Sequence, residues 1–280
     1  MSTAPFAFPA PAKLNLMLRV VGRRPDGYHL LQTVFRFIDF HDTVTVRLRS
    51  DARIERTADL PGVPAESDLA VRAARLLQRA TGVGRGAELA VAKSIPMGAG
   101  LGGGSSDAAT VLLALNHLWG TGLRRAELQQ LAVELGADVP VFVFGENALA
   151  EGIGEKLTRI ELAPAWYVVL TPPVTVPTAR VFAHPDLKRD SETIRIQRLS
   201  ADIAVNDLQA VVCREYPEVG RHLAWLAQHG PALMTGSGSA VFAAFGSESE
   251  AQAVFARVPP DMRGFVARGL ERHPLRDLAD

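Results

Sequence analysis

The sequence predicts an α+β fold made of two closely joined domains. Segments with the period-two pattern of strands and segments with helical spacing follow one another without the strict strand–helix rhythm of a doubly wound sheet. The length of 280 residues suits two joined domains, and 48% hydrophobic residues suffice for a core. We expect the first domain to cover residues 1–157 and the second to cover residues 158–280.

The first half opens with an amphipathic strand. Apolar and polar side chains alternate from Ala12 to Val20, which predicts one buried face and places Lys13 and Asn15 together on the opposite face. We expect a tight polar turn to separate the two strands that follow. The expected elements of this half are strands at 12–20, 33–39, 43–48 and 88–92, and helices at 68–81, 106–119 and 124–135.

The second half repeats the mixture of strands and helices. Ser247 and Glu250 form a capping-box pattern, which predicts the start of a helix after Ser247. The proline-rich stretch 172–177 is expected to be irregular. The expected elements are strands at 166–170, 240–245 and 264–268, and helices at 215–228 and 248–256.

Composition excludes several classes of protein. Thirty basic and thirty acidic residues cancel, so no basic excess indicates a nucleic-acid or membrane partner. No apolar run approaches the roughly 18 residues of a membrane span, and the first residues lack the pattern of a signal peptide. The single cysteine, Cys213, forbids an internal disulfide and fits a reducing cytoplasm. We expect a cytoplasmic protein.

A glycine-rich stretch from Pro96 to Ser106 carries the functional argument. It holds five glycines in eleven residues and leads directly into a predicted helix. Glycines let the backbone approach a ligand closely, and a helix N-terminus presents free N–H groups and partial positive charge. Together with the two serine hydroxyls, and with Lys93 just upstream, the stretch predicts a phosphate-binding loop.

Two common nucleotide motifs do not fit this loop. Gly98, Gly100 and Gly103 satisfy G-x-G-x-x-G, but no acidic residue lies between Asp107 and Glu127, where a dinucleotide fold would need one for the ribose. A Walker loop requires lysine at position 104, which is glycine here. A flexible loop without a ligand remains the alternative, and it would cost considerable backbone entropy.

Five segments in fixed order resemble the GHMP kinase superfamily. These are Pro11–Leu16, Gly27–Thr33, Gly98–Asp107, Gly136–Phe142 and Thr235–Ala240, and they extend over nearly the whole chain. The resemblance implies an N-terminal ribosomal-protein-like α/β domain, a C-terminal ferredoxin-like domain and a shared cleft. The second and fourth segments resemble the branch that phosphorylates, with ATP, the 2-hydroxyl of a cytidine-diphosphate-linked methylerythritol on the non-mevalonate route to isoprenoid precursors.

The resemblance also implies roles for individual residues. Asp138 and Lys13 would be the catalytic pair: the carboxylate orients the acceptor hydroxyl and takes its proton late, while the ammonium holds that carboxylate and stabilises charge on the phosphoryl group. Without the resemblance, a helix cap and a solvent-facing lysine would explain them equally well or better. The residues implied in ATP binding are Lys93, Pro96, Met97, Gly98, Ala99, Gly100, Leu101, Gly102, Gly103, Gly104, Ser105 and Ser106.

The implied substrate site lies elsewhere in the chain. Tyr28 and Phe182 would sandwich the cytosine, His29 would bond its edge, and Asn15 would bind substrate; Phe35 is a weaker candidate for the same pocket. The second glycine loop, with Gly236, Ser237 and Gly238, would approach the phosphates and brace the first loop. Without the family resemblance, aromatic and histidine residues in loops are more often packing or surface residues.

Some features depart from the family pattern or stay open. Asp68 stands where asparagine is expected, which puts adenine contacts there in question, and Asp107 receives no role. No metal-ligand cluster is visible, so the expected cofactor is ATP with Mg²⁺. We expect a small-molecule substrate and a monomer or weak homodimer. The alternatives are a mevalonate- or homoserine-type kinase, or a non-catalytic nucleotide-binding module.

Overall fold

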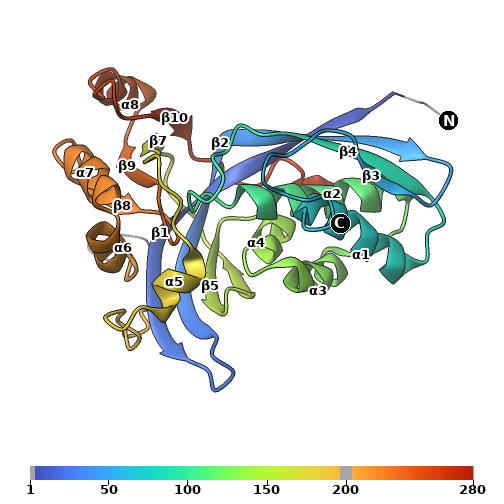
Figure 1. Ribbon diagram of the computed structural model, residues 1–280, viewed down its shortest axis with the longest axis horizontal. Helices are drawn as coiled ribbons and strands as arrows, with labels where there is room; N and C mark the ends of the chain where they lie inside the picture. Colours follow the sequence, from blue (N-terminus) through green and yellow to red (C-terminus); the bar gives the residue numbers. More distant parts are fainter. Residues whose placement is uncertain (1–3, 196–203, 280) are drawn as a thin grey trace.

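Two sheets organise the chain in the computed structural model, which describes residues 4–195 and 204–279. Figure 1 shows the larger sheet with its helices on one side of the molecule and the smaller sheet with its helices on the other. The larger sheet has the strand order β3-β4-β2-β5-β6, with β1 paired to β2; the smaller has the order β10-β7-β9-β8. The predicted two-domain α+β class is confirmed.

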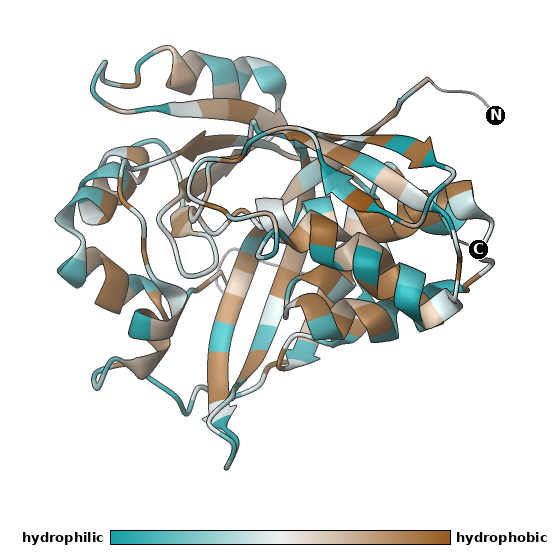
Figure 2. Ribbon diagram, turned by 45° about the vertical axis from the view of Figure 1, so that its right-hand side comes forward, coloured by the Kyte–Doolittle hydropathy of each residue, from teal (hydrophilic) through white to brown (hydrophobic). Residues whose placement is uncertain are grey.

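The first domain is a sheet covered on one face by four helices. Asp68 caps the first of these, accepting a hydrogen bond from Ala70 N at 2.9 Å. Apolar residues of α1 and α2 pack on the sheet, and Figure 2 shows hydrophobic stretches alternating with hydrophilic ones along the helices of this domain. The elements are β1 (Phe6–Arg23), β2 (His29–Arg49), β3 (Ile54–Arg56), α1 (Leu69–Thr81), β4 (Gly86–Ala92), α2 (Gly103–Trp119), α3 (Arg125–Leu135), α4 (Val139–Phe144), β5 (Ala148–Gly152) and β6 (Lys156–Arg159).

The hairpin of β1 and β2 is longer than the sequence predicts. The expected turn between residues 39 and 43 does not exist, because β2 runs without a break from His29 to Arg49. Its pairing with β1 shifts between Ile38↔Ala12 and His41↔Pro11, so Asp39 and Phe40 form a bulge in place of a turn. Extra residues in one strand bend the ribbon, and this bend lets the hairpin extend into the second domain (Figure 1).

The expectation of one buried face on β1 is also wrong. Residues 10–18 are buried on both sides of the strand. Leu14 and Met17 pack in a cluster that includes Tyr167 and Phe242 of the second domain, so the second sheet covers the face that a single-domain strand would leave in water. Lys13 and Asn15 are therefore buried polar residues that need internal partners.

The second domain places its helices against an antiparallel sheet. The helix expected over residues 215–228 is confirmed as a helix that begins at Pro217, a position that tolerates proline. Tyr216 leaves the helical conformation and separates it from a short preceding helix that the sequence did not predict. The Ser247–Glu250 capping box is confirmed. The elements are β7 (Trp166–Leu170), α5 (Thr178–Ala183), α6 (Gln209–Glu215), α7 (Pro217–Leu226), β8 (Ala232–Met234), β9 (Val241–Phe245), α8 (Glu248–Phe255), β10 (Gly264–Arg268) and η2 (Arg276–Leu278).

The end of the chain returns to the first domain. Leu270 N donates to Phe37 O at 2.8 Å, and His273 N donates to Gly145 O at 2.9 Å. The predicted boundary after Leu157 stays a prediction; those residues lie in β6. Within the described residues, no helix is long and apolar enough to cross a bilayer.

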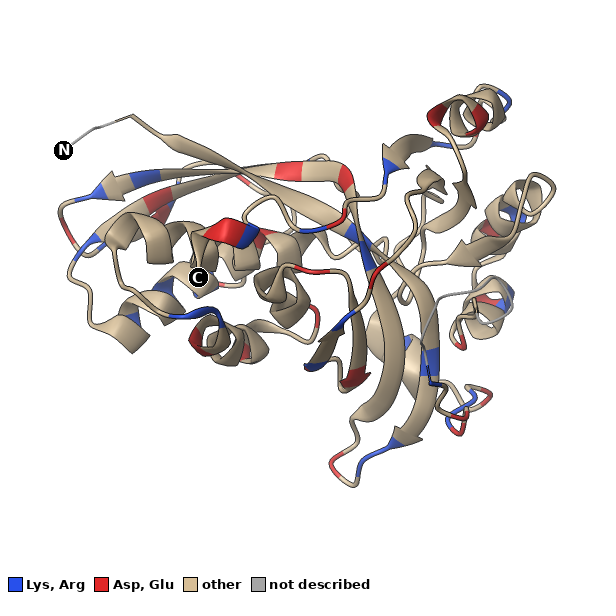
Figure 3. Cartoon of the chain, turned by 180° about the vertical axis from the view of Figure 1, so that it is seen from behind, with Lys and Arg blue, Asp and Glu red and all other residues tan. Residues whose placement is uncertain are grey.

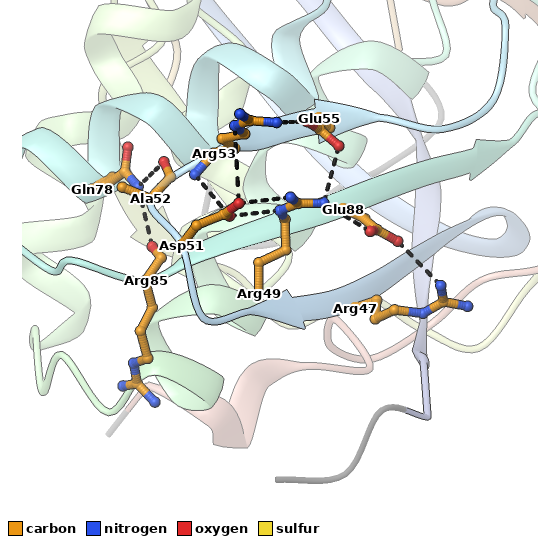
Figure 4. A network of polar contacts seen from close by, with 9 residues as sticks. All are labelled: Arg47, Arg49, Asp51, Ala52, Arg53, Glu55, Gln78, Arg85 and Glu88. Atoms are coloured by element: carbon orange, nitrogen blue, oxygen red, sulfur yellow. Dashed lines mark hydrogen bonds and ion pairs between the residues drawn. The ribbon is translucent and has the colours of Figure 1, made fainter.

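Charged residues of both signs are interspersed over the chain (Figure 3). A surface network of polar contacts, drawn in Figure 4, joins neighbouring strands β2, β3 and β4. Its centre is Arg49, whose two-pronged contact with Asp51 lowers the pKa of that carboxyl to about 2. Residues of both charge signs meet within the network.

Candidate active site

A pocket of about 340 Å³ lies where the two domains meet. Its walls come from β1, β2, the first glycine loop, the start of α4, the region of α5 and the second glycine loop. The predicted residues that line it are Lys13, Asn15, Phe35, Gly98, Gly100, Ser105, Asp138, Phe182, Gly236, Ser237 and Gly238. Segments that are far apart in the sequence thus converge on one cavity.

The first glycine loop has the backbone that its glycines make possible. Gly98, Gly100 and Gly102 all have positive φ, between 68° and 76°. A Cβ on Gly100 would lie 2.3 Å from Thr235 O, so only glycine lets the two loops approach this closely. In the rest of the loop, Ala99 and Leu101 are buried in the core between the domains, whereas Met97 is exposed.

The loop ends at the N-terminus of α2, which has no side-chain cap. The first helical turn therefore presents free N–H groups and the positive end of the helix dipole near the pocket. The Ser105 hydroxyl group belongs to a pocket-lining residue, and the Ser106 hydroxyl is buried without a hydrogen-bond partner. This is the chemistry of a phosphate-binding site.

The second glycine loop packs directly on the first. Ala240 N donates to Ala99 O at 3.0 Å, and the Thr235 hydroxyl lies 3.3 Å from Gly100 O. Gly236 and Gly238 have positive φ and line the pocket beside Ser237. The loops of the two domains therefore hold one another.

Lys13 is the buried cation of the pocket. Its Nζ donates to Asn15 Oδ1 at 2.6 Å and forms an ion pair with Asp138 Oδ2 at 3.2 Å, and it lies 5.3 Å from the centre of the Phe35 ring. The Lys13 side chain is 3% exposed and that of Asp138 is 37% exposed, so the carboxylate faces the cavity with the ammonium behind it. Although Asp138 occupies the N-cap position of α4, its side chain makes no capping hydrogen bond.

Two threonines that the sequence analysis missed hold Asn15 in place. Asn15 Nδ2 donates to Thr33 Oγ1 at 2.8 Å, and Asn15 N donates to Thr235 Oγ1 at 2.9 Å. Both are buried, and Thr33 also lines the pocket. Thr33 and Thr235 lie inside the segments that carry the family resemblance, and this was the only feature of the sequence that could have drawn attention to them. Their contacts with Asn15 join distant parts of the chain, so no local pattern predicts them.

Lys93 lies in a buried cluster with Asp42 and Asp107, here called the Lys93 cluster. Lys93 Nζ pairs with Asp42 Oδ2 and, at 2.7 Å, with Asp107 Oδ2; the other Asp42 oxygen accepts from Ser94 N and Ile95 N. Lys93 thus holds the start of the first glycine loop to α2. Its charge is already balanced by two carboxylates, which differs from the expected free positive charge at the phosphates.

One ammonium cannot neutralise two buried carboxylates. Burial raises the pKa of Asp107 to about 7; the Lys93 charge opposes this increase and the Asp42 charge adds to it. Burial alone would lower the pKa of Lys93, but the two carboxylates outweigh burial and raise it. Near neutral pH, Asp107 is therefore a group that can hold a proton. Asp68 has a structural task as well, because it pairs with Arg56 at 3.3 Å besides capping α1.

The aromatic residues predicted to bind the base are arranged unequally. The His29 and Phe182 rings lie 4.9 Å apart, centre to centre, at an angle of 35°. Tyr28 is 63% exposed and lines a neighbouring hollow of about 200 Å³, which shares Ala137 and Ile153 with the main pocket. Phe182 therefore packs against His29 with its ring tilted, while Tyr28 lines the adjoining hollow and is largely exposed.

Comparison with known proteins gives the class first. The model described as the GHMP kinases N terminal domain matches residues 68–146, and that described as GHMP kinases C terminal matches residues 184–262. The fold and the site thus define a GHMP kinase, an ATP-dependent kinase of small molecules.

Closely similar relatives define the branch. A 4-diphosphocytidyl-2-C-methyl-D-erythritol kinase of Thiobacillus denitrificans is 61% identical over 97% of this chain and 98% of its own length. One of Nitrosospira multiformis is 60% identical over 100% of this chain and 96% of its own. A crystal structure of 4-(cytidine 5'-diphospho)-2C-methyl-D-erythritol kinase superposes with a TM-score of 0.82 at 34% identity, covering 94% of this chain and 99% of that one. The chain belongs to the 4-diphosphocytidyl-2-C-methyl-D-erythritol kinase family.

Proposed function

We propose that this chain transfers the γ-phosphoryl group of ATP to the 2-hydroxyl of 4-diphosphocytidyl-2-C-methyl-D-erythritol. The observation that carries the proposal is the Lys13–Asp138 ion pair, whose carboxylate faces a cavity bounded by both glycine loops. A phosphate at the N-terminus of α2 and a hydroxyl at Asp138 would both lie inside this cavity. An acceptor and a donor held in one pocket are what phosphoryl transfer requires.

In the proposed reaction the substrate oxygen forms a bond to the γ-phosphorus while the bond from phosphorus to the β,γ-bridging oxygen breaks. ADP leaves, and the hydroxyl proton passes to Asp138. The carboxylate orients the hydroxyl, and the Lys13 ammonium compensates negative charge near the transferred group. Asn15 holds the Lys13 ammonium in place through a 2.6 Å hydrogen bond, so the ammonium is already oriented toward the carboxylate and the transferred phosphoryl group.

Mg²⁺ would be bound mainly through the ATP phosphates. Among the described residues there is no group of three or more acidic, histidine or cysteine side chains that could hold a metal. The unpartnered Ser106 hydroxyl and the pocket-lining Ser105 fit a phosphate-bound cation, which prefers oxygen ligands. Mg²⁺ supplies charge neutralisation on the phosphates.

We further propose that the cytosine binds where Phe182 and His29 meet, with Tyr28 closing over it from the rim. The protein would act in the cytoplasm as a monomer or weak homodimer. The substrates of a mevalonate- or homoserine-type kinase contain no base, so those alternatives do not account for this aromatic pair.

The test measures ADP release with the cytidine-linked substrate, with mevalonate and with homoserine. We expect turnover with the first alone. Asp138→Asn should lower kcat by about 10²- to 10⁴-fold, the usual contribution of a positioned acid–base group. The control is Glu161→Gln, since that side chain is 90% exposed and lies outside the pocket. Full activity of Asp138→Asn would disprove the assigned role, and turnover of mevalonate or homoserine in place of the cytidine-linked compound would disprove the assigned substrate.

A further inference from the structure

Arg189 contacts the predicted base site through His29. Its Nε–H donates to His29 Nε2 at 3.1 Å. A guanidinium group is always protonated and has only donors, so the nitrogen that accepts this bond must carry a lone pair. His29 is consequently a neutral imidazole whose single N–H is on Nδ1. Within residues 4–195 and 204–279 that Nδ1 has no protein hydrogen-bond partner, and the ring packs against Phe182, which lines the main pocket.

The electrostatic surroundings favour the same state of His29. Burial lowers the pKa of the imidazole, and the positive charges of Arg189 and Arg23 lower it further. A second proton on the ring would remove the lone pair that Arg189 uses. The hydrogen bond and the neighbouring charges therefore both favour a neutral His29 whose proton is on Nδ1.

Arg189 is itself held rigidly by backbone carbonyls. One terminal nitrogen donates to Phe182 O at 2.9 Å and His184 O at 2.7 Å, and the other donates to Leu187 O at 3.0 Å. Two of these carbonyls lie at the end of α5, where a cation is favourable. One side chain thus fixes both members of the ring pair, His29 by its tautomer and Phe182 by the end of its helix.

We infer that Arg189 is a positioning residue that sets base specificity. By holding the proton of His29 on Nδ1, it makes this nitrogen a hydrogen-bond donor that cannot accept a hydrogen bond. A pyrimidine read at its N3 position must then offer an acceptor. Cytosine has a lone pair on N3 and can accept this hydrogen bond. Uracil and thymine carry a hydrogen on N3, so two donors would face one another and no hydrogen bond could form. This inference rests on the proposed function, because it requires the base to bind at His29.

The experiment uses Arg189→Met, which removes every donor but keeps a side chain of similar length. Lys188→Met is the control, since Lys188 is the exposed neighbour. With the wild type we expect kcat/KM for the cytidine-linked substrate to exceed that for its uridine counterpart by about 100-fold or more, as unpaired polar groups penalise the wrong base. Arg189→Met should raise KM for the cytidine compound about tenfold and reduce the discrimination to about tenfold or less, with kcat and KM for ATP retained.

A second readout does not depend on turnover. Nitrogen-15 NMR of the histidines, with His29 assigned by its loss in His29→Gln, should show Nδ1–H and a bare Nε2 at pH 7 in the wild type. Arg189→Met should show mixed tautomers. An Nε2–H tautomer or an imidazolium in the wild type would overturn the inference, whatever the kinetics.

Phe182→Ala separates the inference from the proposed function. If Phe182→Ala raises KM for the cytidine compound but Arg189→Met leaves base discrimination intact, the base binds here and the role of Arg189 is wrong. If both Phe182→Ala and His29→Gln leave KM unchanged, the base binds elsewhere and the proposed placement fails. The thermal unfolding temperature of each variant is measured as a control. A variant whose unfolding temperature falls could have a raised KM because α5 is no longer folded, and it would not be counted.

Discussion

The Lys93 cluster makes the stability of this protein depend on pH in a direction opposite to that of most acidic residues. The perturbation is Asp107→Asn, which keeps the shape of the side chain and removes its titration. In the folded protein the pKa of Asp107 is raised to about 7, from an ordinary value of 3.8. Lys93 remains paired with Asp42 in the variant, so the connection between the loop and its neighbours is kept.

The sign follows from comparing the folded and unfolded states. Below pH 3.8 both states hold the proton; between 3.8 and 7 only the folded state does; above 7 neither does. The stabilising contribution is therefore fully present at low pH and is lost as pH rises through 7. Between pH 8 and pH 6, integration gives an increase in the free energy of unfolding of about 1 kcal/mol from this one group.

Urea unfolding of the wild type and Asp107→Asn at pH 6, 7 and 8 measures the effect. Histidines such as His222 and His273, whose pKa values burial lowers, destabilise the fold as pH falls, but they do so equally in both proteins and cancel in the difference. The wild type should gain about 1 kcal/mol relative to the variant from pH 8 to pH 6.

Asp51→Asn is the matched control for this experiment. The Asp51 carboxyl has a pKa of about 2 beside Arg49 on the surface (Figure 4), so it stays ionised throughout the measured range. Its difference from the wild type should not change with pH. A difference between wild type and Asp107→Asn that is equally constant would refute the reasoning, because it would mean that the carboxylate is ionised throughout this range.

Two further predictions concern the glycine loop and its metal. Gly100→Ala should lower the free energy of unfolding by about 2 kcal/mol or more and raise KM for ATP, because alanine disfavours positive φ and its Cβ would lie 2.3 Å from Thr235 O. Gly104→Ala, whose Cβ would meet only Leu69 at 3.7 Å, should keep wild-type stability; equal stability of the two variants would contradict the argument. Removing Mg²⁺ with EDTA should abolish ADP release, and added Mg²⁺ should restore it; undiminished turnover in EDTA would show that transfer needs no divalent cation.

Local sequence patterns predicted most of the regular elements. The helix of residues 69–81 with its Asp68 cap and Gly82 stop, and the helix opened by Ser247 and Glu250, depend on interactions within a few residues. The misjudged elements depend on distant contacts. The residues between Asp39 and Thr43 were predicted to form a turn, because nothing local distinguishes a turn from a bulge whose partner strand lies some thirty residues earlier.

The site shows the same division between local and distant information. The glycine loop was predicted as a phosphate site from its own composition, and its backbone has the expected positive φ values. The pairing of Lys13 with Asp138 followed only from family resemblance, since residues so far apart share no sequence pattern. Asp42, Asp107 and Arg189 could not be assigned in this way, because their partners are set by how β2, α2 and α5 pack.

The two lysines near the pocket differ because of what covers them. Lys93 meets two carboxylates within the first domain, so its charge is used to hold the glycine loop to α2. Lys13 meets one carboxylate, and its other partner, Asn15, is fixed by Thr235 from the second domain. The position of the Lys13 ammonium therefore depends on a contact between the two domains. Docking of the two sheets, which buries β1 on both faces, therefore places Lys13 in the position that its proposed catalytic role requires.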